Sequence, residues 1–223
     1  MDSQLIVYED NNIIICNKPV GMASQSERSF EKDLLSEMLS YRTSKKEPAY
    51  LAIINRLDKP VGGLVLFAKD KKTAASLSAM SGEHSIEKYY YALAEGVLPE
   101  KGEYTDYLLK ETKGNISRVV KEDTPGAKKA RLIYEKIGQK EIDGVLYSLV
   151  KVRLLTGRHH QIRLQFAHHG HPLYGDMKYN KNFADKRGVS PALFAYHLSF
   201  KNPVGIDRIT VEVEPKGTVW NME

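Results

Sequence analysis

The sequence predicts an α+β fold, with a large mixed, mostly antiparallel sheet and flanking helices. Strand-like segments outnumber helical ones, and short polar or glycine-containing turns join most consecutive strands, as in β-hairpins. The 223 residues contain no internal repeat and no low-complexity segment. Because no change of composition marks a boundary, we expect a single domain that covers residues 1–223.

Short runs of apolar, β-branched and aromatic residues predict strands along the whole chain. These runs cover residues 5–8, 13–16, 50–54, 64–68, 88–94, 103–109, 116–121, 127–137, 145–155, 193–200 and 209–213. Two glycine-containing turns, at 113–115 and 143–144, are expected to close hairpins.

Three segments predict helices. Residues 30–42 place leucines and a methionine on one stripe, with Ser29 as the expected N-cap. Residues 71–80 follow Asp70, a second candidate cap. Residues 158–168 begin just after the Thr156-Gly157 stop at the end of a strand. This last helix carries several of the candidate functional residues.

The charge is unevenly distributed. Residues 110–187 contain 17 Lys and Arg against 8 Asp and Glu, a net charge of +9, whereas the whole chain carries +5. A basic segment in an otherwise mildly acidic chain is typical of proteins with a polyanionic partner.

The cysteine content and hydropathy indicate where the protein works. A single cysteine, Cys16, excludes an internal disulfide and favours a reducing compartment. No apolar run approaches the length of about 18 residues that a membrane span needs. We expect a cytoplasmic protein with no membrane partner.

One carboxylate stands out by its position. Asp58 lies in a charged turn, between Arg56 and Lys59, with apolar strand-like runs on both sides. Neighbouring cations keep an acid ionised, which suits a nucleophile or an ion-pair anchor better than a general acid. A surface turn with solvated charges is the equally simple alternative.

The helix at 158–168 supplies a second set of candidates. Arg158, next to Gly157, is expected at the helix start, where free backbone N–H groups would bind an anion. Arg163 lies among apolar residues, so its buried guanidinium should need a carboxylate, either Asp58 or Asp176.

Histidines and tyrosines complete the set of candidates. Five histidines cluster near the same helix, at positions 159, 160, 168, 169 and 171. Their spacing is not that of a metal site, and we interpret them as a polar surface for phosphate contact. In the strand at 88–94, Tyr90 should lie on the face opposite Tyr89 and Tyr91, where it could stack on a base.

Several motifs, in this order, resemble those of RluA-type pseudouridine synthases. The resemblance lies in Tyr8-Glu9-Asp10, the NKPVG segment 17–21, RLD at 56–58 with GLVLFAK at 63–69, Lys88-x-Tyr90, TGRHHQIR at 156–163 and the segment 170–176. Two departures stand beside it. Asn55 replaces the family's usual histidine, and residues 60–62 replace its usual Asp-Thr-Ser.

The resemblance implies a fold, a reaction and site residues. It implies that the chain isomerises specific uridines in structured rRNA or tRNA with neither metal nor cofactor. It also implies that Asp58 attacks during glycosidic cleavage, that Arg163 pairs with Asp58, and that Tyr90 stacks on the target uracil. Arg56 would fill the space of the flipped nucleotide. The implied substrate-binding residues are Arg56, Leu57, Lys88, Arg158, His160 and Ile162.

Three further expectations complete the interpretation. We expect a monomer, and no N-terminal S4 RNA-binding domain. A catalytically silent RNA-binding protein of the same fold is the main alternative. A glycosidase with Asp58 as nucleophile is less favoured, because no second carboxylate is evident beside it.

Overall fold

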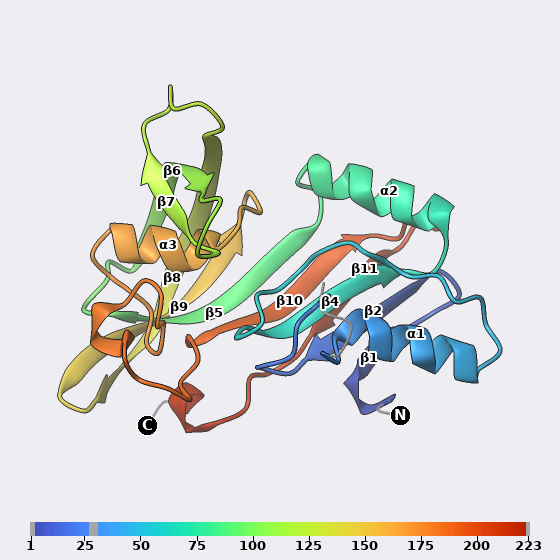
Figure 1. Ribbon diagram of the computed structural model, residues 1–223, viewed down its shortest axis with the longest axis horizontal. Coiled ribbons are helices and arrows are strands. Elements are labelled where there is room, and N and C mark those ends of the chain that lie inside the picture. The colour runs from blue at the N-terminus through green and yellow to red at the C-terminus, as the bar shows by residue number, and fades with distance from the viewer. Residues whose placement is uncertain (1–2, 27–30, 222–223) are drawn as a thin grey trace. The chain divides into compact units, whose positions relative to one another are not determined.

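The computed structural model describes residues 3–26 and 31–221, and in them the chain divides into two compact units (Figure 1). Unit 1 comprises Met1–Lys88 and Ala195–Pro215, and unit 2 comprises Tyr89–Phe194 and Lys216–Glu223. The chain passes from one unit to the other within strands β5 (Glu87–Glu95) and β10 (Leu193–Lys201). The predicted single domain stays a prediction, and each unit is described by itself.

The α+β class and the mostly antiparallel sheet are confirmed in the described residues. In unit 1 the strand order is β1-β2-β4-β10, with β3 beside β4 and β11 beside β10. These strands are β1 (Ile6–Glu9), β2 (Ile13–Lys18), β3 (Ala52–Ile53), β4 (Gly62–Ala68) and β11 (Arg208–Glu212). In unit 2 the order is β5-β9-β8-β6-β7. These strands are β6 (Lys101–Lys110), β7 (Ser117–Val120), β8 (Lys128–Ile142) and β9 (Val145–Leu154).

In the part of the chain that the structure describes, three α-helices accompany the strands, together with three single turns of 3₁₀-helix. The α-helices are α1 (Leu34–Ser44), α2 (Lys71–Gly82) and α3 (Gln161–His168), and the 3₁₀ turns are Ser3–Leu5, Lys181–Phe183 and Thr218–Trp220. Among the described residues, none of the helices is long and apolar enough to cross a membrane.

Two of the predicted helix starts are wrong, each for a local reason. Helix α1 begins at Leu34 instead of residue 30, because the buried carboxylate of Asp33 accepts the Ser36 N–H at 2.7 Å and caps the helix. The predicted cap, Ser29, lies outside the described residues. Helix α3 begins at Gln161, because the preceding residue, His160, is left-handed with a φ of 54°.

One predicted strand is much shorter than expected. Residues 50–54 contribute only the two-residue strand β3, because the Tyr50 carbonyl accepts a hydrogen bond from the buried Arg42 guanidinium instead of joining the sheet. The Asp70 cap of α2 and the turn at 143–144 are confirmed, and both turn residues have positive φ.

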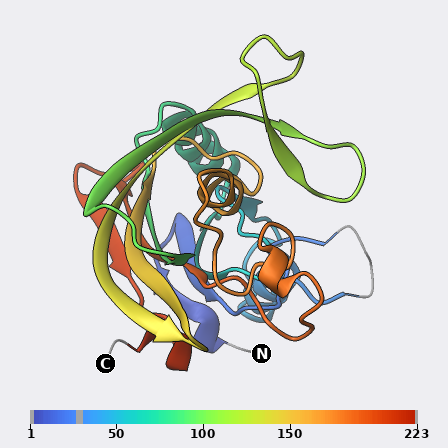
Figure 2. The same cartoon turned by 90° about the vertical axis from the view of Figure 1, so that its left-hand side faces the viewer.

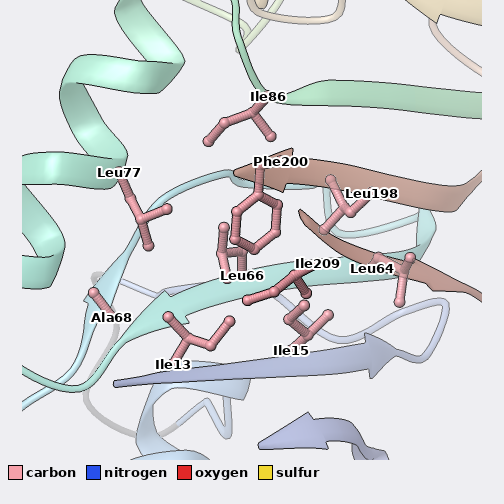
Figure 3. Packing of buried hydrophobic residues seen from close by; sticks show 10 residues of the cluster. All are labelled: Ile13, Ile15, Leu64, Leu66, Ala68, Leu77, Ile86, Leu198, Phe200 and Ile209. Atoms are coloured by element: carbon pink, nitrogen blue, oxygen red, sulfur yellow. The ribbon is translucent and has the colours of Figure 1, made fainter. Parts of the chain in front are cut away.

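The core of unit 1 fills the space between the sheet and α2. Figure 3 shows its members pointing toward one another from strands and helix: Ile13, Ile15, Leu64, Leu66, Ala68, Leu77, Ile86, Leu198, Phe200 and Ile209. Strand β4 is buried along its whole length, from Gly62 to Ala68. This strand begins directly after the turn that holds Asp58.

The backbone of β4 lies very close to β10 at Gly63. Gly63 has a φ of +116°, and a Cβ at this position would lie 2.2 Å from the Ala195 carbonyl oxygen. We expect Gly63→Ala to lower the free energy of unfolding by about 3 kcal/mol, from strain and backbone displacement together.

Gly21→Ala is the matched control for Gly63→Ala. Gly21 also has a positive φ, of +88°, but no atom lies within 4 Å of the point that a Cβ would occupy. Its substitution should therefore cost only about 1 kcal/mol, from backbone strain alone. Equal losses for the two variants in urea unfolding would show that the close approach to β10 is not what requires the glycine.

In unit 2 the strands curve around α3 (Figure 2). Phe166 of α3 contacts the rings of Tyr104 and Tyr134, with centroid separations of 5.2 and 5.6 Å. Leu164 packs with Leu108 and Ala130 on the same side of the sheet. The buried face of the sheet thus fixes the helix that carries Arg163.

Candidate functional site

The Asp58 turn is joined to β4 through Asn55 and is closed by a hydrogen bond of its own backbone. The Asn55 side chain donates to the Leu64 carbonyl at 3.1 Å and accepts from the Leu66 N–H at 2.8 Å. Within the turn, the Val61 N–H donates to the Asp58 carbonyl at 2.9 Å. The Asn55 side chain thereby forms hydrogen bonds with β4 beyond the point where the backbone pairing of β3 with β4 ends. Asp58 itself is half-buried.

A second loop, residues 19–24, braces the same turn. The Ser24 hydroxyl donates to the Leu57 carbonyl at 2.8 Å and accepts from the Leu57 N–H at 3.0 Å. The Gly21 N–H donates to the Lys59 carbonyl at 2.9 Å. The backbone on both sides of Asp58 is therefore held, while the neighbouring Arg56 is exposed.

Lys18 lies fully buried behind this turn. Its ammonium group donates to three backbone carbonyls, those of Pro19 at 3.0 Å, Met22 at 2.6 Å and Lys59 at 3.3 Å. Burial lowers the pKa of Lys18 to about 8, and the negative charge of Asp58 partly opposes that shift. Sequence reasoning did not propose Lys18 as a site residue, although it lies in the matched segment 17–21.

The lowered pKa of Lys18 makes its contribution to stability depend on pH. Between about pH 8 and pH 10.5 the unfolded chain holds a proton on Lys18 that the folded chain has released, so the burial penalty disappears as the pH rises. We expect the unfolding free energy of the native protein, minus that of Lys18→Met, to rise by about 2 kcal/mol from pH 7.5 to 10.

Taking the difference between two proteins cancels the titration of the other groups. Lys72→Met, at an exposed lysine of α2, is the control, and its difference from the native protein should stay flat over the same range. A flat difference for Lys18→Met as well would mean that the Lys18 ammonium is not destabilised by its surroundings.

In unit 2, Arg163 forms a buried ion pair with Asp176. The guanidinium Nε donates to Oδ2 at 2.8 Å and Nη2 donates to Oδ1 at 2.7 Å. Arg163 is 3% exposed and Asp176 is not exposed at all. Burial of Arg163 beside a carboxylate is confirmed, and Asp176 is that carboxylate. The predicted pairing of Arg163 with Asp58, a residue of unit 1, stays a prediction.

Tyr90 is buried in β5, and its neighbours alternate as predicted. It pairs with Val152 of β9, while Tyr89 and Tyr91 pair with Arg153 and Lys151 on the other face. Those two cations lie 5.8 and 6.0 Å from the ring centroids of the tyrosines that they face. Tyr90 thus lies on the face against which α3 packs.

Arg158 does not lie at a helix start with free N–H groups as expected, while its predicted role in substrate binding stays a prediction. The Arg158 N–H is not free, because it donates at 3.0 Å to the side-chain oxygen of Gln161, which also accepts the Thr156 hydroxyl at 2.8 Å. Helix α3 starts three residues after Arg158, and the Arg158 Nε donates to the Lys129 carbonyl. The Gln161 side chain therefore takes the place that an anion would need.

Four of the five histidines near α3 fall into two groups, and the fifth, His171, contacts the Glu95 carbonyl at 2.9 Å. His159 contacts Ser117 and Asn115 of the β6–β7 hairpin region, and its ring stacks on His160 at 3.8 Å. His169 instead contacts Asp106 at 3.1 Å, with His168 nearby. Within residues 3–26 and 31–221, no group of three His, Cys, Asp or Glu side chains could hold a metal ion.

The remaining predicted substrate-binding residues are mostly buried. Leu57 is buried in unit 1, and Ile162 and His160 are buried in unit 2. Lys88, the last residue of the first segment of unit 1, is half-buried, and burial lowers its pKa. Unit 1 therefore brings together Arg56, Leu57 and Asp58, and unit 2 brings together His160, Ile162 and Arg163 around α3.

Comparisons with known proteins find RNA pseudouridine synthases. A family model described as RNA pseudouridylate synthase matches residues 12–168. The chain is 32% identical to "tRNA pseudouridine synthase C" of Haemophilus ducreyi, over 92% of this chain and 88% of that protein. It is 27% identical to "Ribosomal large subunit pseudouridine synthase D" of Neisseria meningitidis, over 97% of this chain but only 59% of that protein.

The fold is also found among solved structures. "Human RNA Pseudouridylate Synthase Domain Containing 1" superimposes with a TM-score of 0.76 at 22% identity, over 94% of this chain and 82% of that chain. At this identity the likeness concerns the fold alone.

Proposed function

Because this chain belongs to the RNA pseudouridylate synthase family, we propose that it converts specific uridines of a tRNA or an rRNA to pseudouridine. The reaction breaks the bond between the ribose C1′ and N1 of uracil, and joins C1′ to C5 of the same base. The hydrogen of C5 leaves as a proton and N1 takes up a proton, so the product is an isomer of the substrate and no electron acceptor is needed. We propose that neither metal nor organic cofactor takes part.

The observation that carries this proposal is the braced turn at Asp58. Hydrogen bonds from Asn55, Ser24 and Gly21 hold its backbone, and Asp58 lies half-buried near the positive charge of Lys18. A carboxylate in a held turn beside a cation suits attack during glycosidic cleavage better than proton donation.

The other proposed roles follow from the resemblance and from the chemistry of each side chain. Arg163 pairs with Asp58 and keeps it ionised, and Tyr90 stacks on the target uracil near the proton that must leave. The exposed Arg56 fills the space of the flipped nucleotide. Lys88, Arg158, His160 and the apolar Leu57 and Ile162 contact the substrate.

The charge of unit 2 supports a nucleic-acid substrate. This unit contains 19 Lys and Arg against 13 Asp and Glu, a net charge of +6, whereas unit 1 carries 14 against 15. RNA affinity should therefore come mainly from phosphate contacts to unit 2 and fall as salt is raised. We also propose a monomer that works in the cytoplasm, which the single buried cysteine supports.

Tritium release tests the proposed function. The protein is incubated with tRNA and, separately, with 23S and 16S rRNA transcripts that carry [5-³H]uridine, and the tritium that enters water is counted. We expect release that reaches a small whole number of uridines per RNA, from one of the two classes. Stable RNA binding without any release from either class would identify the catalytically silent alternative.

A further inference from the structure

The turn that follows α3 encloses the Arg163 guanidinium on two sides. The Asp176 carboxylate lies along its edge, with the two short hydrogen bonds to Nε and Nη2. The ring of Tyr179 lies against it, 5.4 Å from the guanidinium carbon. Edge and face of the same guanidinium are thus both contacted by residues 176–179.

The carboxylate that grips Arg163 is itself fixed. Oδ1 of Asp176 accepts the backbone N–H of Lys178 at 3.0 Å and that of Tyr179 at 3.3 Å. The turn also depends on Gly175, whose φ is +74° and where a Cβ would lie 2.2 Å from the Ser190 carbonyl oxygen. A buried carboxylate with this support cannot follow a moving guanidinium, so it defines where the guanidinium lies.

The Tyr179 ring is fixed through its hydroxyl group. The hydroxyl oxygen accepts the Ser117 N–H of β7 at 2.8 Å and lies 2.8 Å from Nδ1 of His160. The ring against Arg163 is therefore tied to the first residue of the β7 strand and to the residue before α3.

We propose that Asp176 and Tyr179 are positioning residues for Arg163 in uridine isomerisation, an inference that rests on the proposed function. With Nε and Nη2 held by Asp176, the guanidinium plane has a single orientation, which fixes the directions of its remaining N–H groups. The Asp176 charge also compensates the desolvated arginine, so Arg163 stays buried and oriented throughout turnover. Neither Asp176 nor Tyr179 needs to touch the RNA.

A double-mutant cycle distinguishes positioning from a purely structural brace. We expect Asp176→Asn to lower kcat about 30-fold and to change KM for RNA less than threefold. In an Arg163→Lys background, the same substitution should lower kcat less than threefold further, because its effect acts through Arg163. Fold-changes that multiply in the double variant would overturn the inference. Asp185→Asn, at an exposed carboxylate of the same region, is the control and should leave kcat unchanged.

Two variants at Tyr179 test the contact with the guanidinium face when Asp176→Asn does not fold. Tyr179→Phe keeps the ring against Arg163 but loses the hydroxyl contacts to Ser117 and His160, so kcat should fall by about threefold to fivefold. Tyr179→Leu removes the ring, and kcat should fall at least tenfold. Equal kcat values for the two variants would contradict a role for the ring.

A nuclear magnetic resonance measurement tests the inference without turnover. We expect the Arg163 side-chain Nε–H to give a slowly exchanging signal, assigned by its loss in Arg163→Lys, that exchanges at least tenfold faster in Asp176→Asn. A failure of the proposed function appears as native protein that releases no tritium, whereas a failure of this inference appears as unchanged exchange or a multiplicative cycle.

Discussion

Asp58→Asn is expected to abolish turnover while RNA binding persists. The substitution keeps the shape of the side chain and removes only the charge that would attack the nucleotide, so we expect tritium release to fall at least about 1,000-fold. RNA affinity should change less than about threefold, because phosphate contacts dominate it. Filter binding and tritium release on the same preparation measure both quantities.

The Lys18 pKa reports on the charge at position 58 in Asp58→Asn, and a second variant serves as control. Since Asp58 opposes the lowering of the Lys18 pKa, that pKa should fall further below about 8 in Asp58→Asn. Asp123→Asn, at an exposed loop carboxylate of unit 2, should retain full turnover. Turnover by Asp58→Asn at more than a tenth of the native rate would exclude Asp58 as the reacting carboxylate.

The second large effect is expected at Arg163. Arg163→Met leaves the Asp176 carboxylate, which has no solvent exposure, without the guanidinium that now compensates its charge. Breaking a buried ion pair from one side costs about 3–5 kcal/mol, and we expect this loss in the free energy of unfolding in urea. Turnover should fall as well, because the proposed partner of Asp58 is removed.

Arg131→Met provides the comparison for the stability measurement. Arg131 also pairs with a carboxylate, Glu103, at 2.7 Å, but both side chains are 45% exposed. An exposed pair of this kind is worth about 0–1 kcal/mol. If Arg163→Met and Arg131→Met were equally stable, burial of the Arg163–Asp176 pair would have no energetic consequence.

Residues whose role is set by their immediate neighbours could be predicted from the sequence. Asp70 caps α2 because the Thr73 N–H lies within one turn of it, and Asp143-Gly144 closes a hairpin because both residues tolerate positive φ. The burial of Arg163 followed from the apolar residues around it in α3. These features depend on the nearest few residues of the chain, which the sequence displays directly.

Residues that act across long distances in the chain could not be predicted. Arg42 binds the Tyr50 and Lys69 carbonyls, so that β3 starts later than expected, and Lys18 reaches the Lys59 carbonyl 41 residues away. Gln161 caps the segment before α3 because His160 turns left-handed, a conformation that histidine adopts too rarely for the sequence to predict it here. In each case a polar side chain forms a hydrogen bond with a backbone group. Which backbone group it reaches is determined by the folded chain and cannot be read from the neighbouring residues.

The buried thiol in β2 has a practical consequence for studying this enzyme. Cys16 is the chain's one cysteine, it pairs with Val65 inside unit 1, and burial raises the pKa of its thiol to about 12. An alkylating reagent can react with it only when unit 1 opens enough to expose this buried side chain. Pulsed alkylation followed by mass measurement therefore times the opening of unit 1 alone, with no engineered label and no signal from unit 2.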